Sequence, residues 1–131
     1  MTTVLHLIQR VEWERLVADD PITNPSLETE GFIHCTDDEQ VLLRVANAFY
    51  RSVPGDFVVL DVTVEDLTSA CIWEAPAHLT SADTDAAPAA PLAPLFPHVY
   101  GPIDRTAVTG ARAVVRDSDG SFVGYADASS T

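Results

Sequence analysis

Short apolar segments rich in β-forming residues recur along this chain, and turn-forming residues separate them. The clearest segment is DFVVLDVTV (56–64), in which Val58, Leu60, Val62 and Val64 alternate and form one face of an extended strand. Other ordered segments of this kind are expected at 3–9, 31–36, 71–76, 95–103, 107–117 and 121–126. The last two are predicted to form a hairpin, with Asp119-Gly120 at its turn.

Helical spacing of apolar residues occurs only in the N-terminal part of the chain. It predicts one short helix within 11–19 and a second helix that ends near Tyr50. Thr36 and Glu39 fit a Thr-x-x-Glu capping box, so the second helix is expected to begin there. Pro21 and Pro25 are expected to keep 19–26 free of helix. Two helices followed mostly by strands, without regular alternation, predict an α+β fold.

The length of 131 residues predicts a single domain over 1–131. Within it, the Ala/Pro/Asp-rich stretch 81–94 has no periodicity and is expected to be a mobile surface loop. Residues 117–131 are expected to form a C-terminal hairpin and tail. No internal repeat is evident.

The charge balance bears on the partners of the protein. The formal net charge is −13, and the seven basic residues are scattered arginines, which disfavours general nucleic-acid binding. No apolar run reaches the length of a membrane span, and the N-terminus does not resemble a signal peptide. With only two cysteines, the chain is expected to be cytoplasmic rather than disulfide-stabilised.

Two histidines occur within apolar predicted strands. His6 shares a strand face with Val4 and Ile8, and His34 lies in GFIHCT. Each is either a core histidine bonded to backbone or a polar group that lines a pocket; if the two strands are neighbours, both rings can face one cleft. Cys35 should point away from His34, so a Cys–His nucleophile pair is not expected.

Two later segments carry further candidates. Glu74 in CIWEAP is either a solvated carboxylate or a group that orients a hydroxyl or acts as a base. His98 and Tyr100 in FPHVYGP share a face if that segment is extended, and they either shape a pocket rim or fasten a turn to the core. No CxxC, HxH or HExxH spacing occurs, so no metal is expected.

Several of these motifs together resemble one protein family. LHLI, the Trp13 helix, EGFIHCT with the helix after it, IWE, and FPHVYGP are similar to the bacterial domain-of-unknown-function family 952, over about residues 3–115. The stretch 81–94 is longer than is usual in that family, and the tail after Arg116 is an addition.

That resemblance implies a fold and a ligand that composition and spacing do not. The family is similar in fold to the ADP-ribosyltransferase superfamily, in which a split pair of small antiparallel sheets grips NAD. Carried over, this implies catalytic roles for His6, His34 and Glu74. It implies NAD contacts from His6, His34, Thr36, His98 and Tyr100.

Three functional hypotheses follow from the residues and the resemblance together. The first is an NAD-using ADP-ribosyltransferase or NAD glycohydrolase, in which a carboxylate stabilises oxocarbenium character on the ribose. The alternative is a non-catalytic module that binds a nucleotide or another small ligand in the same cleft. The third is an accessory protein whose pocket no longer has a function.

Overall fold

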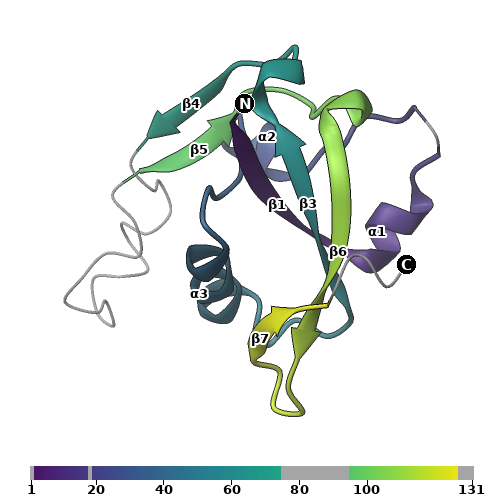
Figure 1. Cartoon of the computed structure of the whole chain (residues 1–131), viewed down its shortest axis with the longest axis vertical. Helices are drawn as coiled ribbons and strands as arrows, with labels where there is room; N and C mark the ends of the chain where they lie inside the picture. The colour runs from purple at the N-terminus through teal and green to yellow at the C-terminus, as the bar shows by residue number, and fades with distance from the viewer. Residues whose placement is uncertain (1, 18, 75–94, 127–131) are drawn as a thin grey trace.

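The computed structural model describes residues 2–17, 19–74 and 95–126, and these form two antiparallel sheets (Figure 1). The larger sheet has the strand order β1-β3-β6-β7, with β1 (Thr3–Gln9), β3 (Phe57–Thr63), β6 (Val108–Arg116) and β7 (Phe122–Tyr125). The smaller sheet has the order β2-β5-β4, with β2 (Ile33–His34), β5 (Phe96–Val99) and β4 (Cys71–Glu74). The predicted strands and the predicted α+β class are thereby confirmed.

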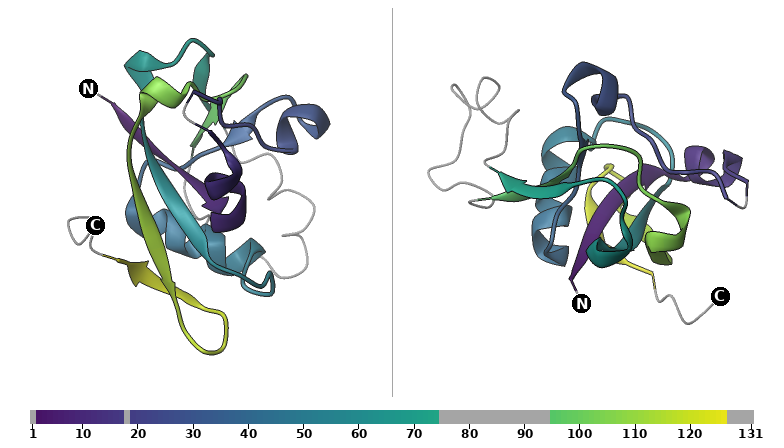
Figure 2. Two further views of the ribbon diagram at one scale, coloured as in Figure 1. Left: turned by 90° about the vertical axis from the view of Figure 1, so that its right-hand side faces the viewer. Right: turned by 90° about the horizontal axis from the view of Figure 1, so that it is seen from above.

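The helices of the described chain are short and lie mainly in its N-terminal part. They are α1 (Arg10–Arg15), α2 (Ser26–Thr29) and α3 (Glu39–Phe49), with 3₁₀ turns η1 (Val64–Asp66) and η3 (Arg105–Ala107). Figure 2 shows α3 and α1 on opposite sides of the large sheet. The central strand β3 is therefore covered on both faces, whereas most residues of β6 and β7 are only partly buried or exposed.

The central strand β3 supplies side chains to both of these faces. Val58, Leu60 and Val62 belong to one buried cluster, which also contains Ile33 of the small sheet and contacts α1 through Trp13. Phe57 and Val59 belong to the other, which contains Leu42 and Ala46 of α3. The predicted shared face of alternate residues in 56–64 is therefore confirmed. The strand reads as a near-continuous apolar run because both of its faces are covered.

The start of α3 differs from the prediction. Its N-cap is Asp38, whose Oδ1 accepts hydrogen bonds from the backbone N–H groups of Gln40 (2.8 Å) and Val41 (3.1 Å). Thr36 lies two residues earlier, in an extended segment paired with β1, so the proposed capping box was wrong. The physical reason is that the backbone of Thr36 forms a β-bridge with Leu5, so the helix begins later and the side chain of Asp38 caps it.

The other helices differ in length and place from the prediction. The helix expected within 11–19 ends at Arg15, because the chain turns there and the N–H of Val17 bonds the carboxylate of Asp20. The helix α2 follows Pro25 directly, although 19–26 was expected to be non-helical. Proline is compatible with a helix start, where its missing N–H would have no partner within the helix.

The segment from β2 to Thr36 connects the two sheets. His34 pairs with His98 of β5, whereas Thr36 pairs with Leu5 of β1 through N–O distances of 2.6 and 2.9 Å. The chain thus leaves one sheet and joins the edge of the other within two residues. The two sheets part at His34, beside His6 of β1, and this is where the site lies.

The expected loop at 81–94 and the last residues of the expected tail, 127–131, lie outside the described residues. The predicted hairpin of 107–117 and 121–126 is present as β6 and β7. Its turn is closed by the backbone bond from the N–H of Gly120 to the carbonyl of Asp117, at 3.0 Å.

Candidate functional site

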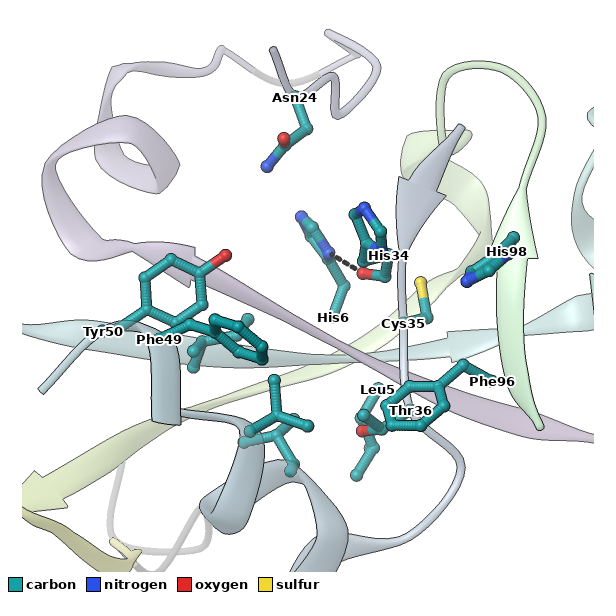
Figure 3. A pocket seen from close by; sticks show the side chains of 13 residues that line it. Leu5, His6, Asn24, His34, Cys35, Thr36, Phe49, Tyr50, Phe96 and His98 are labelled. Atoms are coloured by element: carbon teal, nitrogen blue, oxygen red, sulfur yellow. Dashed lines mark hydrogen bonds between the residues drawn. The ribbon is translucent and has the colours of Figure 1, made fainter. Parts of the chain in front are cut away.

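A pocket of about 70 Å³ lies beside the edge of β1, between α3 and the small sheet (Figure 3). Such a volume holds roughly five water molecules or a small ligand head. Its wall is mostly apolar, with a few polar side chains among aromatic and aliphatic ones. The lining consists of Leu5, His6, Leu7, Asn24, His34, Cys35, Thr36, Leu42, Val45, Phe49, Tyr50, Phe96 and His98.

His6 is the most informative polar residue of the pocket. Its ring is 2 % exposed, and Nδ1 lies 3.1 Å from the backbone carbonyl oxygen of His34. Because a carbonyl oxygen can only accept, Nδ1 must carry the proton. Burial lowers the pKa of His6 to about 4, so the ring is neutral near pH 7 and Nε2 is a hydrogen-bond acceptor.

The acceptor nitrogen Nε2 of His6 is buried and has no hydrogen-bond partner in the described part of the chain. Figure 3 shows this nitrogen on the side of the ring that faces Asn24. Buried polar groups in folded proteins are nearly always satisfied. We therefore expect this nitrogen, which lies in a pocket wall, to accept a hydrogen bond from a water molecule or a ligand.

Two further polar atoms in the same wall share this property. The Thr36 hydroxyl and Nε2 of His98 are buried and lack a partner among the residues described. The His98 ring is 1 % exposed and stacks on Phe32 at a centroid distance of 4.0 Å and an interplanar angle of 18°. The pocket thus combines apolar walls with several buried polar atoms that the described chain leaves unsatisfied.

Glu74 and Tyr100 lie behind His98 rather than in the pocket wall. Oε1 of Glu74 accepts a hydrogen bond from Nδ1 of His98 at 2.8 Å and another from the Tyr100 hydroxyl. The bonds from Tyr100 and His98 lower the pKa of Glu74, and the bond to Glu74 raises the pKa of Tyr100. Glu74 therefore fixes the orientation of His98, which directs Nε2 of that ring inward.

The His34 side chain contacts the carboxylate of Glu30, a residue that the sequence analysis did not identify. Nε2 of His34 lies 3.2 Å from both carboxylate oxygens of Glu30, and 27 % of the His34 side chain is exposed. The His34 and His98 rings make an edge contact at a centroid distance of 5.3 Å. His34 thus contributes its backbone carbonyl to His6 and its ring to the pocket wall.

Cys35 is a buried residue that also lines the pocket. It is 2 % exposed within the cluster that contains Val4 and Ile33, and burial raises the pKa of its thiol. A buried thiol in these surroundings stays protonated and unreactive. The expectation that no Cys–His nucleophile pair forms at GFIHCT agrees with this placement.

The structure brings four of the six candidate residues to one pocket, namely His6, His34, Thr36 and His98. Sequence reasoning missed Asn24, Phe49, Tyr50 and Phe96 as lining residues. Phe49 and Tyr50 carried a usable signal, because they end the predicted helix that follows GFIHCT. Asn24 carried none, since its place depends on the path of the chain between α1 and α2.

Within the described ranges, no group of three or more His, Cys, Asp or Glu side chains is arranged to hold a metal ion. Over the same ranges no helix has the length and apolar character needed to cross a bilayer.

The chain is a small α+β protein in which two antiparallel sheets part beside an apolar pocket with several polar atoms in its wall. The family described as "Protein of unknown function (DUF952)" matches residues 7–111, and the chain belongs to this family.

Similar solved structures include those of the protein CC0527 from Caulobacter crescentus. Its crystal structure is 24 % identical in sequence, with a TM-score of 0.67 over 93 % of this chain and 94 % of that one. Its solution structure is 25 % identical, with a TM-score of 0.58 over 92 % and 90 % of the two chains. A comparison with curated proteins found no match.

Proposed function

We propose that this protein binds a small organic ligand in the pocket between its two sheets, with Nε2 of His6 accepting a hydrogen bond from the ligand. The observation that carries this proposal is the set of buried, unsatisfied polar atoms on His6, Thr36 and His98, as counted over the described residues. Such an arrangement, a few convergent polar groups in an apolar wall, is typical of ligand sites.

The chemistry of the pocket wall favours an aromatic head group with a hydrogen-bond donor. Phe49, Phe96 and Leu42 offer apolar and aromatic surface, and His6 requires an N–H or O–H from the ligand. The carboxamide-bearing ring of nicotinamide has both properties. It is therefore the head group that we propose, and the resemblance to NAD-binding folds makes NAD the corresponding larger candidate.

Titration calorimetry with nicotinamide and with NAD tests the binding proposal. Wild type is expected to bind at least one of them, and His6→Asn is expected to weaken that binding about tenfold or more. Asn keeps an N–H for the carbonyl of His34 but removes the acceptor at Nε2. Thr36→Val removes the second polar atom, and Thr109→Val on β6 is its matched control. Unchanged affinity in His6→Asn, or no binding by wild type, contradicts the proposal.

A second proposal is cleavage of NAD at the nicotinamide–ribose bond, by transfer to an acceptor or to water. Its motive is the ADP-ribosyltransferase-like fold that the family resemblance implies, in which NAD would lie between the two sheets, where this pocket is found. The proposal is also supported by the ionised Glu74 carboxylate, one hydrogen bond away from the pocket through His98. A carboxylate in this place can stabilise positive charge that develops on the ribose.

Release of nicotinamide from NAD, followed by chromatography, tests this second proposal. Wild type is expected to release nicotinamide faster than a buffer blank, and Glu74→Gln is expected to reduce the rate. Glu14→Gln, which changes a carboxylate on the exposed surface of α1, is the matched control. Release at the blank rate, with binding intact, would leave the protein as a non-catalytic binding module.

A further inference from the structure

A wider groove of about 950 Å³ adjoins the small pocket, and a ligand head seated in the pocket would extend into it. The pocket and the groove share Leu7, Asn24 and Tyr50 in their linings. The groove continues between the end of β1, helix α2 and the turn after α3. Its chemistry therefore decides what can be attached to the head group.

Among the described residues, no cationic side chain lines the pocket or the groove. All seven arginines of the chain lie in the described residues and the chain has no lysine, yet none of the arginines lines the pocket or the groove. Arg15 forms an ion pair with the groove residue Glu12 at 3.1 Å, so each of these two charges partly offsets the other. Arg116 donates to the backbone carbonyl of the groove residue Val53 at 2.7 Å. The first amides of α3 are bonded to Asp38, so that helix start is also unavailable to an anion.

Carboxylates surround the site instead. Glu12 and Glu28 line the groove, and Glu30 lies beside the pocket on His34. The pKa of Tyr50, which lies between pocket and groove, is raised by burial and by the negative charge of Glu30. Like charges in a partly enclosed cleft repel an anionic ligand more strongly than they would in open water.

We propose that this site selects phosphate-free ligands: an uncharged or cationic compound whose donor-bearing ring enters the pocket and whose remainder lies in the acidic groove. This inference rests on the proposed function and narrows its ligand class. It assigns the selection to Glu12 and Glu28. By the same argument, NAD, the larger candidate named above, binds more weakly than a nicotinamide nucleoside, which carries the same ring without phosphate.

Calorimetric titration of wild type with four compounds tests the inference: nicotinamide, nicotinamide riboside, nicotinamide mononucleotide and NAD. The riboside is a cation without phosphate, and the mononucleotide differs from it only by a phosphate group. The riboside is expected to bind about tenfold more tightly than the mononucleotide or NAD at low salt. The difference is expected to shrink at high salt, because exposed charges are screened.

In the double variant Glu12→Gln/Glu28→Gln, the preference for the riboside over the phosphorylated compounds is expected to fall to about threefold or less, mainly because the phosphorylated compounds bind more tightly. The control Glu14→Gln/Asp66→Asn makes the same change in net charge away from the groove and should leave this preference unchanged. Equal or tighter binding of the mononucleotide to wild type overturns the inference while leaving the proposed function intact. Failure of all four compounds to bind overturns both.

Discussion

His6 combines an apolar environment with a fixed tautomer, and both have measurable consequences. Its pKa is about 4 in the folded protein because of burial, against an ordinary value of 6.5 in the unfolded chain. Between these two values the unfolded state binds more protons than the folded state. The contribution of the neutral His6 ring to the free energy of unfolding is therefore complete above pH 6.5, and it is lost as the pH falls toward 4.

We predict that this residue alone removes about 2 kcal/mol of the free energy of unfolding between about pH 6.5 and pH 5. Chemical denaturation of wild type and His6→Asn at the two pH values measures the effect. The variant has no ionisable group at this position, so it should lose correspondingly less stability. Equal losses in the two proteins would show that the His6 ring is not buried in a neutral form.

The bond between Tyr100 and Glu74 gives a second prediction at this scale. In Glu74→Gln the phenol of Tyr100 should titrate at lower pH than in wild type, because the carboxylate that raises its pKa is gone. The chain has three tyrosines, so NMR of labelled tyrosine rings can follow each one. Tyr125, whose pKa of about 12 has burial as its main cause, is the internal control and should not move. An unchanged Tyr100 midpoint would contradict the assigned contact.

Part of the site could be predicted at the level of single residues. A histidine within an apolar alternating strand is a recognisable anomaly, and it identified both His6 and His34. Glu30, which engages His34, was not identified because the contact depends on the turn after α2, whose position no local pattern fixes. The role of Glu74 behind the pocket wall, rather than in it, likewise depends on the twist of β4 against β5.

Among the secondary-structure elements, the strands follow from sequence and the helix ends do not. Period-two patterns located β1, β3 and the β6–β7 hairpin, because burial of alternate faces leaves a direct record in the sequence. The start of α3 was misplaced, since Thr36-x-x-Glu39 matches a capping box yet Thr36 pairs with Leu5. A local sequence pattern cannot show that the backbone of a residue is hydrogen-bonded to a strand far away in the sequence.

The observed cap predicts the outcome of three substitutions. Asp38→Ala should lower the free energy of unfolding by about 1 kcal/mol, because two amides of α3 lose their acceptor. Asp38→Ser should recover most of this loss, since serine also caps helices. Thr36→Val should cost less than Asp38→Ala. Urea denaturation of the three variants measures this order, and a larger cost for Thr36→Val would restore Thr36 as the cap.

In the molecule as a whole, the site exists because two sheets share one connecting segment. Neither sheet alone forms the pocket: β1 supplies His6, β2 and the residues after it supply His34 and Thr36, and β5 supplies His98. The sequence predicts the strands but not which of them pair, because pairing over long separations leaves no local pattern. The family resemblance supplied the idea of two sheets, and the described residues confirm that arrangement.

The central claim is that Nε2 of His6 is unprotonated and accepts a hydrogen bond from the ligand. Nitrogen NMR of ¹⁵N-labelled histidine during a titration with nicotinamide tests it most directly, with His6→Asn to assign the signal among the four histidines. We predict that Nε2 of His6 begins at the position of an unprotonated nitrogen and shifts saturably as ligand is added. A protonated Nε2 in the free protein, or a His6 signal unmoved at the highest ligand concentration, would contradict the account.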